Sequence, residues 1–126
     1  DKTLQKKVED LPELLKTNIE LILGNHDVGC DIKNLKIFNI RKTKNLSFSH
    51  EPVNSEDKKT LNICGHYHPK IYLKNNGDRL SFRCFAMDMK KNTLYLPAFG
   101  DLTGGYPCKK SFKKWAILSE NEILEI

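Results

Sequence analysis

Histidine and asparagine side chains follow short apolar segments at three separate places in the chain. The segments cover residues 19–23, 46–49 and 61–64, and the polar residues after them are Asn25, His26, His50, His66 and His68. Imidazole nitrogens and amide oxygens bind divalent transition metals. A histidine can also transfer a proton near neutral pH. We therefore expect these side chains to form a site for metal binding or acid–base chemistry.

The local spacing of these residues suits such a site. His66 and His68 are two residues apart, which places both rings on one side of an extended backbone. Asn25 and His26 are adjacent, so their side chains should diverge, and one can bind a metal while the other faces a substrate. Because the carboxyl ends of strands in α/β sheets open onto the binding crevice, three such strand ends predict a shared pocket.

Hydrophobic periodicity predicts the elements that position these side chains. Apolar residues at helical spacing predict one amphipathic helix over 4–15, restarted at Pro12. Apolar or alternating runs predict strands over 19–23, 35–40, 46–50, 61–64, 71–73, 80–87, 93–96, 115–119 and 122–126. The stretch Asn75-Asn76-Gly77-Asp78 is a hairpin signal. We expect an α/β fold in a single domain that spans residues 1–126.

The composition is that of a globular domain with a basic surface. Of 126 residues, 39% are hydrophobic and 29% charged, and the net charge is +5. This charge favours a polyanionic partner such as nucleic acid, although scattered lysines also simply solvate a surface. No apolar run approaches the roughly 20 residues of a membrane helix, and no CxxC pair occurs. We expect a cytoplasmic protein with reduced thiols and no membrane association.

The order of the motifs resembles the calcineurin-like metallophosphoesterase superfamily. Its last three motifs are matched by Gly24-Asn25-His26-Asp27, by His50 at a strand end and by Gly65-His66-Tyr67-His68. Pro69 directly follows the last of these motifs. Together with the later stretches 96–100 and 103–105, it resembles the ligase-associated DNA-damage-response endonuclease branch of the superfamily. The resemblance extends from about Leu15 to about Leu118.

This resemblance implies a fold, an activity and roles for the candidate residues. The fold would be a two-sheet αββα sandwich, and the activity a phosphodiesterase with two divalent metal ions, usually manganese, with iron, zinc or nickel as alternatives. Asn25, His50 and His66 would bind one metal, and His68 would bind the second. His26 would be the catalytic proton donor, and the substrate would be DNA or another phosphodiester.

The chain departs from the family pattern before Asn25. The family's first two motifs, Asp-x-His and Gly-Asp-x-x-Asp, supply the bridging aspartate, and no residues before Asn25 match them. The predicted sandwich is therefore N-terminally truncated, with at most one well-liganded metal site. Two other interpretations stay open. One is a catalytically inactive binding module, or a fragment that needs an N-terminal half or a second copy; the other is a structural metal site that joins strands.

Several residues near these motifs have both a functional and a structural interpretation. A turn or surface role is favoured over an acidic or ligand role for Asp27, Glu51, Asp88 and Asp101. Packing is favoured over stacking on a base for Tyr67 and Phe99. Gly104 and Gly105 are expected to permit a tight turn near the site. The densest basic patch, which could contact a phosphate backbone or form a solvated face, contains Lys109, Lys110, Lys113 and Lys114.

Overall fold

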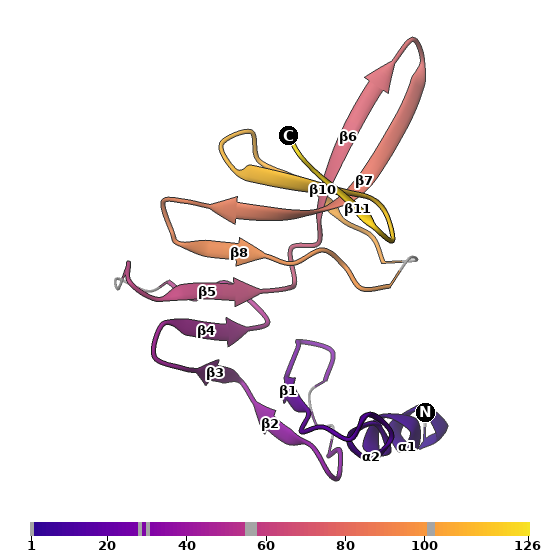
Figure 1. The fold of residues 1–126 in the computed structure, drawn as a ribbon, viewed down its shortest axis with the longest axis vertical. Coiled ribbons are helices and arrows are strands. Elements are labelled where there is room, and N and C mark those ends of the chain that lie inside the picture. The colour runs from indigo at the N-terminus through magenta and orange to yellow at the C-terminus, as the bar shows by residue number, and fades with distance from the viewer. Residues whose placement is uncertain (1, 28, 30, 55–57, 101–102) are drawn as a thin grey trace.

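Short helices precede a long series of strands in the computed structural model, which describes residues 2–27, 29, 31–54, 58–100 and 103–126 (Figure 1). The helices are α1 (Lys2–Glu9) and α2 (Leu11–Leu15). The strands are β1 (Glu20–Ile22), β2 (Lys36–Phe38), β3 (Ile40–Lys42), β4 (Leu46–Ser49), β5 (Leu61–Cys64), β6 (Pro69–Asn75), β7 (Asp78–Asp88), β8 (Thr93–Tyr95), β9 (Tyr106–Pro107), β10 (Lys113–Ser119) and β11 (Glu122–Glu125). The described residues thus form a mixed, sheet-rich α/β fold with few helices.

Most of the elements lie where the sequence predicts them, with two differences. The helix expected over 4–15 is interrupted at Asp10 and restarted with Pro12 in the first turn of α2, as predicted, because proline is tolerated in the first turn of a helix but not in its interior. The expected strand over 35–40 is divided at Asn39, since β2 pairs with β1 whereas β3 pairs with β4. The two-residue strand β9 was not predicted.

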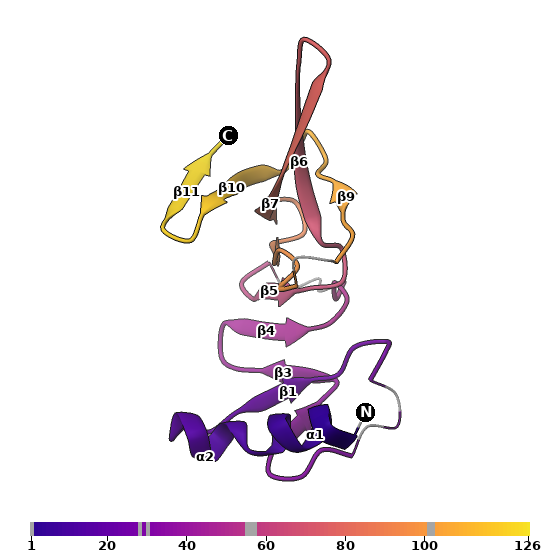
Figure 2. The same ribbon diagram turned by 90° about the vertical axis from the view of Figure 1, so that its right-hand side faces the viewer.

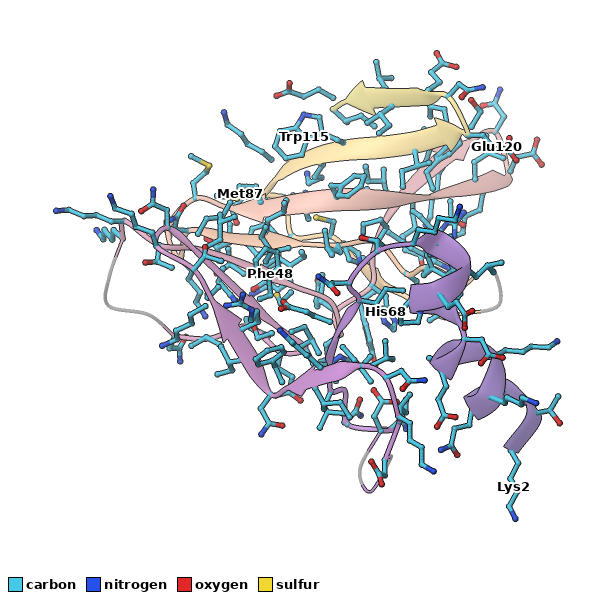
Figure 3. All side chains as sticks on the ribbon, turned by 60° about the horizontal axis from the view of Figure 1, so that its bottom comes forward. Lys2, Phe48, His68, Met87, Trp115 and Glu120 are labelled. Carbon is cyan, nitrogen blue, oxygen red and sulfur yellow. The ribbon has the colours of Figure 1, made fainter. Side chains whose placement is uncertain are left out.

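The strands form a nine-stranded mixed sheet and a separate two-stranded parallel sheet. The order in the large sheet is β11-β10-β7-β8-β5-β4-β3, with β6 paired to β7 and β9, and the small sheet is β1-β2. Strands β4, β5 and β8 are parallel neighbours at the centre of the large sheet. Phe48 on β4 and Trp115 on β10 therefore lie toward opposite edges of the sheet (Figure 3).

Strand β7 belongs to two different pairings along its length. Its first half, Asp78–Arg83, pairs with β6 in a hairpin, and its second half pairs with β10 and β8. The hairpin extends away from the rest of the sheet in both views (Figures 1 and 2). Its turn lies at Asn76 and Gly77, as the sequence signal predicts, and both residues have a positive φ.

The buried core lies along the centre of the large sheet. One cluster contains Cys64, Ala86, Tyr95 and Phe112, and a second contains Ile71, Cys84 and Ala116. Cys108 packs against both clusters. Neither helix buries a residue, so both α1 and α2 lie outside this core at the β1–β2 end of the molecule (Figure 2).

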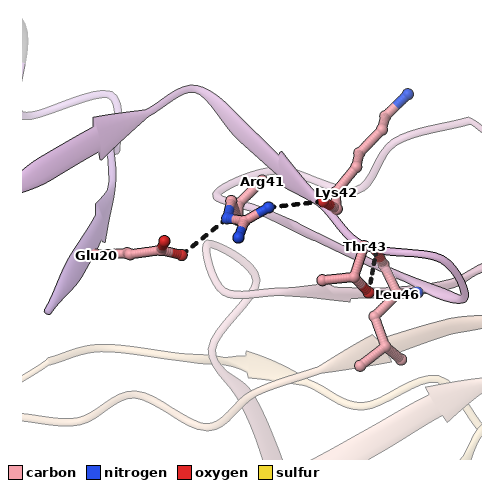
Figure 4. Close-up of polar contacts among 5 residues, drawn as sticks. All are labelled: Glu20, Arg41, Lys42, Thr43 and Leu46. Carbon is pink, nitrogen blue, oxygen red and sulfur yellow. Dashed lines mark hydrogen bonds and ion pairs between the residues drawn. The ribbon is translucent and has the colours of Figure 1, made fainter. Parts of the chain in front are cut away.

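A small polar cluster joins the two-stranded sheet to the large sheet. The Arg41 guanidinium on β3 forms an ion pair with Glu20 on β1, with 2.9 Å between Nε and Oε2, and donates through Nη1 to the Lys42 carbonyl (Figure 4). The same guanidinium lies 5.3 Å from the centre of the Phe38 ring. These contacts hold the amino end of β1, and Phe38 on β2, beside β3. They thereby anchor the small sheet from which the chain continues to Asn25.

Candidate functional site

Strands β4 and β5 deliver two of the predicted residues side by side. The strands are parallel, with Ser49 opposite Cys64, so the chain leaves both at the same edge of the sheet. His50 directly follows β4, and the Gly65 amide, directly after β5, donates to the His50 carbonyl at 3.1 Å. His50 and His66 are therefore brought together by strand pairing, as the sequence predicts.

A tight turn after β1 delivers Asn25 to the same place. The Leu23 amide donates to the Phe38 carbonyl and so continues the pairing of β1 with β2. The Asp27 carboxylate then accepts a hydrogen bond from the Gly24 amide at 2.8 Å, and the Asp27 amide donates to the Gly24 carbonyl at 3.1 Å. A Cβ on Gly24 would lie 3.1 Å from the His50 ring, so glycine permits this close approach.

Polar atoms of Asn25 and His66 both lie close to the same nitrogen of His50. His50 Nε2 lies 2.9 Å from Asn25 Oδ1 and 3.0 Å from His66 Nδ1. The two rings meet edge to face, with 4.8 Å between their centres. On the far side of the cluster, Glu51 Oε1 lies 3.8 Å from His66 Nε2. The cluster thus contains an amide, two imidazoles and a neighbouring carboxylate.

A single hydrogen atom does not satisfy this group of atoms. A neutral imidazole carries a hydrogen on one nitrogen and a lone pair on the other. If His50 Nε2 carries the hydrogen, it donates fully to only one of its two neighbours; if it carries the lone pair, it faces the Asn25 oxygen, which is also an acceptor. In the first tautomer two acceptors thus share one hydrogen, and in the second the lone pairs of His50 Nε2 and Asn25 Oδ1 face each other. A cation among these atoms would satisfy their lone pairs.

The cluster opens into a cleft that contains the remaining predicted site residues. The cleft has a volume of about 710 Å³. Its lining residues are Gly24, Asn25, His26, Asp27, His50, His66, His68, Gly104, Gly105 and Tyr106. His26 thus shares the cleft with the metal-ligand candidates, as the sequence predicts, and it is exposed there.

His68 lines the cleft without joining the cluster of Asn25, His50 and His66. Burial lowers the pKa of His68, and the positive charges of His66, His50 and Lys70 lower it further. The backbone at His66 and His68 is left-handed, with φ of 56° and 46°, so the expectation of an extended backbone there was wrong. Such conformations are uncommon outside glycine and cluster at functional sites. The structure thus brings His68 to the cleft without testing its predicted role as a metal ligand.

Metal binding itself stays a prediction. Among the described residues, no group of three or more histidine, cysteine, aspartate or glutamate side chains is arranged to hold a metal ion. The convergent atoms instead belong to two histidines and one asparagine.

The carboxylates singled out from the sequence have mainly structural contacts. Asp27 closes the turn with Gly24, and the Asp88 carboxylate accepts hydrogen bonds from the Lys90 and Lys91 amides at the β7–β8 turn. Glu51 is exposed and lies near His66. Asp101 lies outside the described residues. The turn and surface roles are therefore confirmed for the first three.

The two aromatic residues singled out from the sequence differ in their environment. Tyr67 packs between the rings of Tyr95 and Tyr106, and its hydroxyl donates to the Pro107 carbonyl at 2.7 Å. Phe99, by contrast, is 104% exposed, so the expectation that it packs was wrong. The loop over 96–100 leaves the sheet at this point, and local sequence does not show on which side its side chains emerge.

Sequence reasoning missed two residues that the structure places at the site. Asn62 on β5 is only 1% exposed. Its side-chain nitrogen Nδ2 donates to the carbonyl and hydroxyl of Ser47 and to the Ser49 hydroxyl. Its side-chain oxygen Oδ1 accepts a hydrogen bond from the Val53 backbone amide. It therefore fixes the segment after His50. Its only sequence signal was a polar residue inside an apolar strand.

Tyr106 is the second residue that was missed. Its ring is largely exposed at the cleft, and it stacks on Tyr67 with 6.0 Å between ring centres. Its amide donates to the His68 carbonyl. Its position directly after Gly104 and Gly105 was the available signal.

Further predictions concern the cysteines and the membrane. Cys64, Cys84 and Cys108 are free thiols, Cys64 is buried in the core as predicted, and Cys30 lies outside the described residues. In the part of the chain that the structure describes, no helix has the length and apolar character needed to cross a bilayer.

Comparison with known proteins links this fold to a nuclease. The structure is similar to the crystal structure of the nuclease MPE from Pseudomonas putida, with a TM-score of 0.75 and 25% sequence identity. The match covers 95% of this chain and 60% of that chain, so the present chain spans well under two thirds of the nuclease's length. No protein-family model and no curated protein matches the sequence. The similarity supports a nuclease-like fold.

Proposed function

We propose that this chain forms part of a divalent-metal-dependent phosphodiesterase that acts on DNA or another nucleic acid. The observation that carries the proposal is the convergence of Asn25 Oδ1, His50 Nε2 and His66 Nδ1 at the ends of three strands. The similarity to a nuclease supports the same activity. The proposal includes membership of the metallophosphoesterase superfamily, a truncated αββα sandwich, an endonuclease role in DNA repair and a cytoplasmic location.

The convergent atoms fit one divalent cation. Ligand atoms at the usual metal–nitrogen bond length lie about 3 Å apart when they are neighbours in a coordination shell, close to the observed 2.9 and 3.0 Å. Imidazole and amide ligands suit manganese, and also iron, zinc or nickel. A bound divalent cation supplies charge neutralisation at a phosphate and lowers the pKa of a water molecule. His68 would contribute to a second metal, for which it is the only candidate ligand found from the sequence.

His26 is the proposed proton donor. It lies in the same cleft as the convergent atoms but is not one of them. A histidine side chain can hold a proton and release it to the oxygen of a leaving group close to neutral pH. Asn25 and His26 thus divide their roles because adjacent side chains diverge.

The proposal is tested by hydrolysis and by metal binding measured separately. With manganese added, the wild-type chain should hydrolyse bis-p-nitrophenyl phosphate, and calorimetric titration should show binding of Mn²⁺. His50→Ala should abolish binding of Mn²⁺, whereas Asn45→Ala, at an exposed position near β4, should retain it. Binding that is equal in these two variants would contradict the proposed metal site.

A catalytically inactive binding module is a second candidate. It is favoured by the separation of His68 from the three-atom cluster and by the lack of a described cluster of acidic and histidine ligands. Such a module would bind nucleic acid while hydrolysing bis-p-nitrophenyl phosphate no faster than buffer containing Mn²⁺. The two measurements together separate the candidates.

Association with further polypeptide is part of the proposal. The chain exposes 9886 Å², whereas a compact monomer of 14.5 kDa exposes roughly 6,900 Å². Large apolar side chains on both helices, including Leu4, Leu14 and Leu15, are exposed. A further polypeptide, either an N-terminal half or a second copy, would bury part of this surface.

A further inference from the structure

The β6–β7 hairpin has one basic face and one apolar face. Directly opposite residues on antiparallel strands place their side chains on the same face. The register gives one face the pairs Lys70–Arg83, Tyr72–Ser81 and Lys74–Arg79, and we call these six residues the basic face. The opposite face has the pairs Ile71–Phe82 and Leu73–Leu80. The basic face therefore carries four cations and no carboxylate.

Three cations of the basic face have no carboxylate partner within the described part of the chain. Like charges directly opposite one another destabilise a strand pair. Among the described residues, Lys70, Lys74 and Arg79 form no ion pair with a carboxylate. Arg79 instead lies over the Tyr72 ring, 4.1 Å from its centre. Stacking holds the guanidinium in place and leaves its N–H edge available to an anion.

The inner end of the basic face is attached to the wall of the candidate site. Lys70 Nζ donates to the Thr103 carbonyl at 3.4 Å, and the Tyr72 hydroxyl donates to the Gly105 carbonyl at 3.5 Å. Gly105 lines the cleft. The basic face thus begins at the cleft wall and continues outward along the projecting hairpin (Figures 1 and 2).

The outer end of the basic face lies several nucleotides away from the cleft. Lys74, paired with Arg79, is four residues beyond Lys70 along β6, which is about 13 Å at the usual rise of a strand. A strand of duplex DNA rises about 3.4 Å per nucleotide along the helix axis, so this distance matches roughly four nucleotides of such a strand and fewer of an extended single strand. Both outer cations are exposed.

We propose that the basic face binds the phosphate backbone of a nucleic-acid strand that continues out of the cleft. Lys70 donates to the Thr103 carbonyl directly before the cleft wall, and Arg83 donates to two carbonyls of the 96–100 loop. Lys74 and Arg79 contact phosphates beyond the cleft. The assignment rests on the proposed function, because it makes the hairpin an extension of the phosphodiester site. It favours polynucleotides over mononucleotides as substrates.

The test measures binding in EDTA, so that no turnover occurs. Fluorescein-labelled oligothymidylates of about 3 and about 12 nucleotides are titrated by anisotropy from roughly 50 to 200 mM salt. The variant is K74Q/R79Q. The matched control is K90Q/K91Q, which removes the same charge from exposed residues of the β7–β8 turn, at the opposite end of β8 from the site. K74Q alone is included because it leaves the Arg79–Tyr72 stack intact.

The expected effect is confined to the longer oligonucleotide. K74Q/R79Q should weaken binding of the longer oligonucleotide roughly tenfold and reduce the slope of log K against log salt by about 1.4. K74Q alone should reduce that slope by about 0.7. K90Q/K91Q should bind as the wild-type chain does. Equal slopes for K74Q and the control would overturn the proposal. So would a wild-type chain that binds the long and short oligonucleotides equally, or that binds an acidic peptide in their place.

The result is independent of catalysis. Hydrolysis of bis-p-nitrophenyl phosphate by the wild-type chain, with Mn²⁺ present, tests the proposed function by itself. If the chain is inactive but shows the length and salt effects, the proposal for the basic face stands. If the chain is active but shows neither effect, that proposal is overturned while the proposed function stands.

Discussion

The His50 ring is held by contacts with two other candidate site residues and with a glycine. His50 Nε2 contacts both Asn25 and His66, and Gly24 lies against the same ring. His26 differs because it is exposed in the cleft. A substitution at His26 should therefore change proton transfer without disturbing the cluster, whereas one at His50 should disrupt the whole cluster.

The first prediction concerns His26. His26→Ala should lower the rate of hydrolysis by about 10²–10⁴-fold, the usual effect of losing a general acid, while Mn²⁺ binding measured by calorimetry is unchanged. Loss of Mn²⁺ binding in this variant would show instead that His26 is a ligand. Activity equal to wild type would remove it from the mechanism.

The second prediction concerns the buried thiol of Cys84. Burial raises the pKa of Cys84 to about 12, with a further contribution from Cys108, so its thiolate is scarce in the folded chain. Because the usual value is near 9.0, the thiolate fraction at pH 8 falls about 1,000-fold. Mass spectrometry should therefore show iodoacetamide labelling of Cys84 only after unfolding. Rapid labelling in buffer would contradict its burial.

The strand ends are held together by elements that carry no candidate catalytic residue. Asn62 on β5 connects β4 to the segment that follows His50. The β9 segment, led by Gly104 and Gly105, forms the opposite wall of the cleft. The geometry of the site thus depends on hydrogen bonding between strands as much as on the ligands themselves.

The third prediction tests the Asn62 network. Asn62→Ala should lower the free energy of unfolding by about 3 kcal/mol, because buried groups of Ser47, Ser49 and Val53 would lose their partner. Asn45→Ala, at an exposed position, should change it by less than about 0.5 kcal/mol. Urea unfolding followed by circular dichroism gives both values. Similar midpoints for the two variants would show that the network contributes little.

The fourth prediction compares two adjacent glycines. A Cβ on Gly105 would lie 2.5 Å from the His68 carbonyl oxygen, whereas a Cβ on Gly104 would have no atom within 4 Å. Gly105→Ala should destabilise the chain by about 1–3 kcal/mol and shift the NMR signals of the His68 ring. Gly104→Ala should do neither. A silent Gly105→Ala variant would mean that β9 lies farther from β6 than the structure shows.

The whole molecule is extended for its mass. Its projecting hairpin and uncovered helices account for a surface larger than that of a compact monomer (Figures 1 and 2). The similarity to the nuclease MPE extends over 60% of that longer chain. Both facts agree with the proposal that further polypeptide covers part of the exposed apolar surface.

The fifth prediction concerns this exposed surface. The 126-residue chain should bind an apolar dye such as anilinonaphthalene sulfonate and should self-associate as concentration rises, because exposed apolar patches favour association. Dye fluorescence and sedimentation equilibrium measure the two effects. Leu14→Lys should reduce both, and Lys90→Gln serves as the control. A monomer that stays dye-free at high concentration would contradict the proposed association.

The sequence by itself determined the candidate site residues and most of the local elements. Neighbouring residues encode the strand ends and the hairpin turn at Asn76 and Gly77, because periodicity and turn preferences act over a few positions. The sequence also places Asn25, His50 and His66 directly after strand-forming segments. The tertiary structure alone decided the pairing of β1 with β2 and the Glu20–Arg41 ion pair. It also decided the Asn62 network and the exposure of Phe99. These features depend on contacts between segments distant in sequence, which local preferences do not specify.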